Sequence, residues 1–175
     1  LQHTLGKDIE LVMKLGPGLP QVLADEDRLK YVILHLVINA RAAMMDTAEQ
    51  VRLSPIGGGD MQWTVAPPGE TRQLIIETTP VRVGSSECEQ RPHLRPGQHV
   101  MISICDTGVG MPEEVRQRLF EPFFSTKEVG TGTGLSLSSI YGTMTQMGGD
   151  IRVKSELGKG TTFSLCVPAA APSAT

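Results

Sequence analysis

The sequence contains no apolar run long enough to cross a membrane and no excess of basic residues. A membrane-spanning helix needs about 20 consecutive apolar residues, no segment approaches that length, and no signal peptide opens the chain. The formal net charge is -3, whereas a generic nucleic-acid or anionic-membrane binder needs a basic surface. We therefore expect no nucleic-acid partner and no direct membrane contact.

Cysteine is also scarce, with three residues at positions 88, 105 and 166. They are widely spaced and form no CxxC pair, which argues against a zinc site and a disulfide framework. Cys105 and Cys166 lie in apolar, strand-like runs and are expected to be buried, inert thiols. This usage fits a reducing cytoplasm.

The chain of 175 residues, with 39% apolar and 20% charged residues, is of a size for one domain with its own core. Residue patterns predict strands at 8–15, 72–83, 99–105, 150–155 and 161–167, and helices at about 25–45, 112–120 and 134–147. The 72–83 and 99–105 strands are expected to pair antiparallel, and the last two strands to form a hairpin. The Gly- and Pro-rich stretch at 54–71 reads as an inserted loop. The predicted fold is α+β: a two-layer sandwich whose mixed sheet of about five strands is covered on one face by about three helices.

Four short motifs follow one another in the chain. They are His35–Ala40, which contains Asn39, then Asp106–Gly110, Gly130–Gly134 and Gly158–Thr161. Each motif alone is weak evidence, but together they supply a metal ligand, an acidic group and a glycine-rich backbone. These are the components of a nucleotide-binding site.

Asn39 is a polar residue within a helix whose neighbours are Leu, Val and Ile. A buried amide costs free energy unless it finds a partner, so one interpretation is a satisfied core amide. The other interpretation is a ligand for Mg²⁺, which prefers hard oxygen donors and shares its coordination shell with phosphates.

Asp106 follows an apolar strand and opens a glycine turn. An ionised carboxylate accepts hydrogen bonds, and the exocyclic amine of adenine donates them. Gly108 and Gly110 would let the backbone approach the flat base. The alternative is an ordinary Asp-Gly turn at the end of a strand.

The third motif lies directly before a predicted helix, where free N–H groups and the helix dipole favour phosphate binding. Gly132 and Gly134 would let the backbone wrap a triphosphate. Lys127 could reach a phosphate or remain solvated. Turn geometry alone explains the glycines of the fourth motif.

In this order the motifs resemble those of the HATPase_c catalytic domain of bacterial sensor and hybrid histidine kinases, in the GHKL superfamily of gyrase, mismatch-repair and chaperone ATPases. The segment 120–127 also resembles the aromatic box and lid of that family, with Phe120 and Phe123 as anchors of the hinge. The resemblance covers residues 8–168 and implies a Bergerat-type fold, an ATP lid at 121–133, and ATP and Mg²⁺ as cofactors. It further implies that Asn39 holds the metal, that Asp106 reads adenine and that Thr161 assists Asp106. The other implied nucleotide-binding residues are Gly108, Gly110, Lys127, Gly130, Gly132, Gly134 and Leu135.

Three positions depart from the family pattern: His35 replaces a common Asn, Ala42 a common charged residue, and Ser136 the glycine of a Gly-Leu-Gly-Leu sequence. His35 could touch the triphosphate or the metal, or simply pack. Because the related ATPases have a catalytic Glu at this position, a stand-alone ATPase or serine kinase is the less favoured interpretation. A catalytically impaired pseudokinase is the other alternative.

The resemblance also implies partners. The phosphoryl group would go to a histidine on a separate dimerisation domain and then to the receiver domain of a response regulator. No histidine of this chain fits the acceptor pattern, and the chain begins with Leu rather than Met. We therefore expect a fragment of a longer cytoplasmic protein, with 1–7 a remnant of the linker to the missing domain and 169–175 a disordered tail. The fragment should be mainly monomeric and the full-length protein a homodimer.

Overall fold

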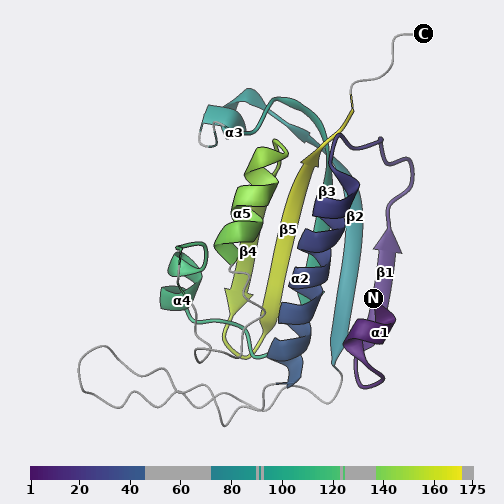
Figure 1. The fold of residues 1–175 in the computed structure, drawn as a ribbon, viewed down its shortest axis with the longest axis vertical. Coiled ribbons are helices and arrows are strands. Elements are labelled where there is room, and N and C mark those ends of the chain that lie inside the picture. The colour runs from purple at the N-terminus through teal and green to yellow at the C-terminus, as the bar shows by residue number, and fades with distance from the viewer. Residues whose placement is uncertain (46–71, 90, 92, 123, 125–136, 171–175) are drawn as a thin grey trace.

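The computed structural model describes residues 1–45, 72–89, 91, 93–122, 124 and 137–170. Helices and strands follow one another along this part of the chain as drawn in Figure 1. They are α1 (Gln2–Leu5), β1 (Glu10–Leu15), α2 (Glu26–Met45), β2 (Gln73–Val83), α3 (Ser85–Glu89), β3 (Gly97–Asp106), α4 (Glu113–Arg118), α5 (Leu137–Gln146), β4 (Asp150–Glu156) and β5 (Gly160–Pro168). The predicted inserted loop at 54–71 lies outside the described residues.

The strands form one five-stranded mixed sheet in the order β1-β2-β3-β5-β4. β1 runs parallel to β2, whereas the other neighbouring pairs are antiparallel. Both hairpins expected from the sequence, β2 with β3 and β4 with β5, are present. The predicted mixed sheet is therefore confirmed.

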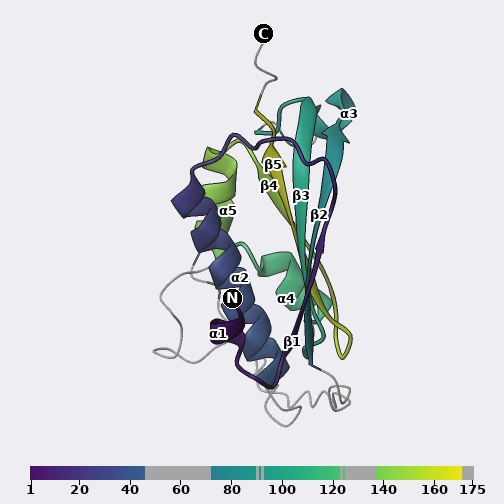
Figure 2. The ribbon, with the colours of Figure 1, turned by 90° about the vertical axis from the view of Figure 1, so that its right-hand side faces the viewer.

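The helices α2 and α5 cover one face of this sheet, with α4 on the same side near one end (Figures 1 and 2). The buried residues of α2 recur at helical spacing and include Val32, Leu36, Val37, Ala40 and Met44. Burying an aliphatic side chain of the size of Leu contributes about 1.5–3 kcal/mol, so this stripe holds the helix on the sheet. The two-layer α+β architecture is confirmed. No helix in the described part of the chain has both the length and the apolar character needed to span a bilayer.

The start of α2 follows from its acidic residues, as predicted. The Oδ1 atom of Asp25 accepts a hydrogen bond of 3.0 Å from the N–H of Arg28. Glu26 and Asp27 lie in the first turn, where the positive end of the helix dipole favours them.

Residues on both sides of the predicted limits of 8 and 168 contact the rest of the described structure. Leu5 of α1 is 2% exposed and belongs to the main core, so the predicted linker remnant packs with the domain. At the other end, the N–H of Ala169 donates to the carbonyl of Gln98 at 2.9 Å, and that of Ala170 to Gln21 at 2.7 Å. These bonds tie residues 169 and 170 to Gln98 and Gln21, and residues 171–175 lie outside the described part. The limits of the domain and the disordered tail stay predictions.

The helix α3 was not expected from the sequence. The Glu87 side chain accepts a hydrogen bond of 3.2 Å from the N–H of Gly84, in the manner of a capping box, and this bond lowers the pKa of Glu87. The segment after β2 folds over the sheet face opposite α2 (Figure 2). There Val83, Leu94 and Cys166 form a second buried cluster.

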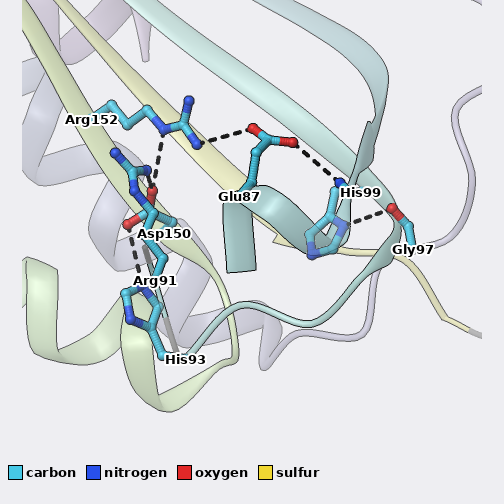
Figure 3. A network of polar contacts seen from close by, with 8 residues as sticks. Glu87, Arg91, His93, Gly97, His99, Asp150 and Arg152 are labelled. Carbon is cyan, nitrogen blue, oxygen red and sulfur yellow. Dashed lines mark hydrogen bonds and ion pairs between the residues drawn. The ribbon is translucent and has the colours of Figure 1, made fainter. Parts of the chain in front are cut away.

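A polar network ties this segment to β4 (Figure 3). The carboxylate of Asp150 is 3% exposed and forms an ion pair with the guanidinium of Arg91. It also lies 3.3 Å from Nε2 of His93 and 3.3 Å from Nε of Arg152. Arg152 in turn lies 3.5 Å from Glu87. The buried charge of Asp150 is thus compensated by cationic and polar partners.

All three cysteines are free thiols. Cys166 is buried as predicted, and burial raises the pKa of its thiol to about 11. Cys105 is only half-buried, because its side chain lies on the sheet face opposite the helices.

Candidate functional site

The register of the sheet brings three polar side chains together at one end of its helix-covered face. Asp106 at the end of β3 pairs with Thr161 of β5, and Thr161 pairs with Ser155 of β4. Directly paired residues of neighbouring strands point to the same face. The three side chains therefore form a row across three strands, next to the core pair Ile104 and Phe163 on that face.

The carboxylate of Asp106 is 3% exposed. Its Oδ1 atom accepts hydrogen bonds from the N–H groups of Gly108 at 2.9 Å and Thr161 at 3.2 Å. Burial raises the pKa of this carboxyl to about 6, although both hydrogen bonds oppose the rise. Among the described residues no cation pairs with the carboxylate and no group donates to Oδ2. One carboxylate oxygen thus retains unused acceptor capacity.

The turn after Asp106 packs directly against α2. The N–H of Val109 donates to the carbonyl of Ala43 at 3.1 Å. A Cβ atom on Gly108 would lie 2.7 Å from the carbonyl carbon and oxygen of Ala43, closer than a close-packed interior tolerates. Gly108 was predicted to let the backbone approach a base, but the structure also shows a contact within the protein that requires a glycine.

Asn39 lies one helical turn before Ala43 and on the same face of α2. It is therefore carried towards the Asp106 turn. Its side chain is half-buried, and the amide has no hydrogen bond to any residue that the structure describes. An amide in this position needs water or a ligand as its partner, so the described contacts do not support the interpretation as a satisfied core amide.

Two further glycines let the β4–β5 hairpin close onto the same turn. Gly160 has φ +92, and its Cβ atom would overlap the carbonyl oxygen of Asp106. Gly110 has φ +68, and its Cβ atom would overlap the carbonyl oxygen of Glu156. A side chain is strained in such a conformation. Turn geometry alone therefore does not explain the glycines of the 158–161 motif, because Gly160 also allows β5 to approach the backbone of Asp106.

Ser155 was missed by the sequence analysis. Its Oγ atom accepts a hydrogen bond from the N–H of Met111 at 2.9 Å, donates to the carbonyl of Gly160 at 3.0 Å and lies 2.9 Å from Oγ1 of Thr161. The signal was available in the sequence: counting outwards from the turn at Gly158 places Ser155 opposite Thr161.

His35 is 8% exposed and packs against Tyr31, with ring centroids 4.5 Å apart and the planes tilted by 55°. Its ring makes no hydrogen bond to the described residues. The observed contact is one of packing. A role for His35 at the triphosphate or the metal stays a prediction.

Five predicted nucleotide-binding residues lie outside the described residues: Lys127, Gly130, Gly132, Gly134 and Leu135. The predicted lid at 121–133 is described only at 121, 122 and 124. The roles of these residues stay predictions.

The described residues next to that segment pack through aromatic rings. The ring of Phe120 lies 5.4 Å from that of Tyr141 on α5, and Phe120 is packed against the main core. The guanidinium of Arg118 lies 4.7 Å from the ring centre of Phe124, a cation–π contact. Phe120 is therefore half-buried against the core. Phe123 lies outside the described residues, and the role of the two residues as anchors of the hinge stays a prediction.

The free acceptor oxygen of Asp106 suits a ligand that donates a hydrogen bond. The described residues include no group of three or more His, Cys, Asp or Glu side chains that could enclose a metal ion. Mg²⁺ does not need such a group, because it usually keeps several waters and is held by one or two protein oxygens together with substrate phosphates. The amide oxygen of Asn39, which has no hydrogen bond to the described residues, fits this role.

Similarity to known proteins points the same way. The sensor kinase CckA of Brucella abortus is 38% identical over 168 residues, which cover 96% of this chain and 15% of that protein. The sensor histidine kinase ZraS of Escherichia coli is 30% identical over 167 residues, covering 95% of this chain and 27% of ZraS. The chain thus spans 15% and 27% of the length of these two relatives.

Solved structures share the fold. Full-length ShkA in complex with AMPPNP gives a TM-score of 0.62 at 26% identity, covering 98% of this chain and 27% of that one. The mycobacterial sensor histidine kinase MprB gives a TM-score of 0.58 at 22% identity, covering 93% and 83% of the two chains. Residues 24–171 match the family of histidine kinase-, DNA gyrase B- and HSP90-like ATPases. The chain therefore belongs to this family and is an ATP-binding catalytic domain of the sensor histidine kinase type.

Proposed function

We propose that the chain binds ATP together with Mg²⁺ and presents the γ-phosphoryl group to a histidine on a separate dimerisation domain. From there the group would pass to the receiver domain of a response regulator. The observation that carries this proposal is the meeting of Asp106, Thr161 and the α2 segment bearing Asn39 at one end of the core. Family membership and the sensor kinase relatives support it.

In this proposal Asp106 recognises the base. Its Oδ1 atom is occupied by two backbone N–H groups, so Oδ2 is left to accept a hydrogen bond from the 6-amino group of adenine. Guanine carries a carbonyl oxygen at that position, and this acceptor would be repelled by Oδ2, which is also an acceptor. The backbone bonds fix the orientation of the carboxylate before the nucleotide arrives.

Asn39 would contribute its amide oxygen to the metal. Mg²⁺, when bound, neutralises charge that develops on the phosphate oxygens during transfer. The rest of the transfer depends mainly on positioning. The glycine motif at 130–134 and Lys127 would complete the phosphate site, as the sequence predicts.

The histidine that receives the phosphoryl group would come from another domain of a longer protein, which we expect to work as a homodimer in the cytoplasm. The relatives are several times longer than this chain, which leaves room for such a domain. Steady ATP hydrolysis by this chain alone would instead favour a stand-alone ATPase.

The test is calorimetric titration of the chain with ATP, with and without Mg²⁺. We expect Asp106→Asn to abolish measurable binding, and Asn39→Ala to weaken Mg²⁺-dependent binding by at least about tenfold because it removes a metal ligand. Lys30→Ala is the matched control on α2, since Lys30 is exposed and pairs with Glu26 near the start of the helix.

Unchanged ATP binding in both site variants would overturn the proposed site. Absence of binding to the unaltered chain at millimolar ATP would favour a pseudokinase. Autophosphorylation of the longer native protein then tests the transfer step itself.

A further inference from the structure

Ser155 occupies the centre of the hydrogen-bonded corner behind the proposed adenine site. Three polar groups lie within hydrogen-bonding distance of its hydroxyl oxygen: the N–H of Met111 at 2.9 Å, the carbonyl of Gly160 at 3.0 Å and the hydroxyl of Thr161 at 2.9 Å. Met111 belongs to the segment after Asp106, and Gly160 and Thr161 open β5, so Ser155 of β4 links the two.

Counting protons leaves one arrangement that satisfies all three contacts. A serine hydroxyl has one proton to donate and two lone pairs that accept. The carbonyl of Gly160 can only accept, so it must receive the proton of Ser155. The N–H of Met111 can only donate, so it takes one lone pair. The remaining contact is satisfied only if the Thr161 hydroxyl donates to Ser155.

This arrangement fixes the direction in which the Thr161 hydroxyl donates its hydrogen bond. Because the Thr161 proton points to Ser155, the Thr161 oxygen can offer only lone pairs to a ligand. Thr161 stands beside Asp106 in the same row of the sheet, and the free oxygen of Asp106 is also an acceptor. Within the described part of the chain, the Asp106 and Thr161 side chains therefore present acceptors and no donor to a ligand.

We propose that Ser155 is a positioning residue that holds the Thr161 hydroxyl as an acceptor and thereby sets the preference for a 6-aminopurine over a 6-oxopurine. The inference rests on the proposed function, because it concerns the base bound at the same site. A 6-amino group donates hydrogen bonds to both acceptors. A 6-oxo group turns a lone pair towards them and is rejected.

Without Ser155, Thr161 loses the acceptor for its proton. Its hydroxyl can then rotate and donate to a 6-oxo group, because a Ser or Thr hydroxyl can act as donor or acceptor. The preference should therefore weaken in Ser155→Ala even where binding of ATP changes little.

The experiment compares the dissociation constants of ATP and inosine triphosphate, whose purine carries an oxo group at position 6 and a proton on N1. Both differences are the same for every variant, so the change in the ratio of the two constants is what is measured. Titration of the chain with Mg²⁺ at pH 8 keeps the Asp106 carboxylate ionised. We expect Ser155→Ala to lower the ratio of the two constants roughly tenfold, as for the loss of one hydrogen bond. Ser155→Thr, which keeps a hydroxyl, should restore the ratio.

A coupled variant shows whether the effect passes through Thr161. Thr161→Val removes the hydroxyl with little change in shape and should lower the ratio by itself, and adding Ser155→Ala should then change it no further. Ser164→Ala is the matched control, because Ser164 contacts Ser103 at 3.5 Å on the opposite face of the same strands.

An unchanged ratio in Ser155→Ala, or an equal fall in the Thr161→Val background, would overturn the role assigned to Ser155. If the unaltered chain bound neither nucleotide, the proposed function itself would fail. The two failures are thus distinguishable. Thr161→Val also keeps the test open if Ser155→Ala does not fold, since unaltered discrimination in that variant contradicts the same inference.

Discussion

Replacing Asp106 with Asn should stabilise the nucleotide-free domain while removing its ability to bind ATP. The carboxylate is 3% exposed and has no cationic partner among the described residues. Asn keeps an oxygen that can accept the two backbone hydrogen bonds from Gly108 and Thr161. The substitution therefore removes a buried charge and leaves the local hydrogen bonds in place.

The size of the effect follows from the pKa of Asp106, which is raised from an ordinary value of 3.8 to about 6. At about 1.4 kcal/mol per pKa unit, this difference corresponds to roughly 3 kcal/mol. Because the folded-state pKa is raised, the folded state binds the proton more tightly than the unfolded chain. Protonation of Asp106 therefore adds to the free energy of unfolding in acid, and this contribution is lost as the pH rises through about 6. The buried charge should then cost roughly 3 kcal/mol at pH 8 and about 1 kcal/mol at pH 4.5.

Urea unfolding of the chain and of Asp106→Asn at both pH values measures this difference. At pH 8 we expect the variant to be more stable by up to about 3 kcal/mol, equivalent to a rise of about 6–12 °C in Tm for a domain of this size. At pH 4.5 the advantage should shrink to about 1 kcal/mol. A variant that is less stable than the unaltered chain at pH 8 would refute the reasoning, because it would mean that the charge is compensated.

Asp150 is the matched control. It is also 3% exposed, but it pairs with Arg91, His93 and Arg152. Asp150→Asn should therefore destabilise the domain at pH 8, by about 1–3 kcal/mol, since the cations are partly exposed and water recovers part of the loss. Opposite signs for the two Asp→Asn variants are the expected signature.

Four further variants test other parts of the structure. Asn39→Ala should change the Tm of the nucleotide-free chain little, since no described hydrogen bond is lost, but should abolish most of the rise in Tm on adding ATP with Mg²⁺. Gly108→Ala should destabilise the domain by about 1–3 kcal/mol through its contact with α2. Gly142→Ala on α5, where a Cβ atom would meet no other described segment within 4 Å, should instead stabilise it by up to about 1 kcal/mol. Equal effects of the two variants on urea unfolding would contradict the packing argument. Leu5→Ala should lower the unfolding free energy by about 2–4 kcal/mol because Leu5 is buried in the core, whereas a linker residue would show almost no change.

Much of the fold could be predicted because its signals are local. The apolar stripe of α2, the acids at its start and the alternation in 150–155 and 161–167 each depend on neighbouring residues. The helix α3 was missed because it has only five residues. Its cap is the hydrogen bond from the N–H of Gly84 to Glu87. This short-range pattern is a weak helix signal by itself, and the contact of Glu87 with Arg152 of β4 cannot be read from the local sequence.

The contacts of the glycines could not be predicted from the residues next to them in the sequence. The sequence motif predicts Gly108 and Gly110 as places where a base approaches the backbone. The structure shows that Gly108 meets Ala43, 65 positions earlier in the numbering of the same chain, and that Gly110 meets Glu156. Such contacts depend on how α2 and the hairpin are arranged around the turn, which no local pattern states.

The different roles of the two buried aspartates also could not be predicted from the residues next to them. Asp106 and Asp150 each lie at the end of a strand near glycine, and both are 3% exposed. They differ in their partners, some of which come from distant segments. Arg91 and Arg152 pair with Asp150. Asp106 receives the N–H groups of Gly108 and Thr161, and its Oδ2 accepts no hydrogen bond from the described residues. A protein selected for stability alone would compensate or remove such a charge. The uncompensated carboxylate is therefore best explained by a ligand whose donor group completes its hydrogen bonding, and the adenine amine of ATP is the donor that we propose.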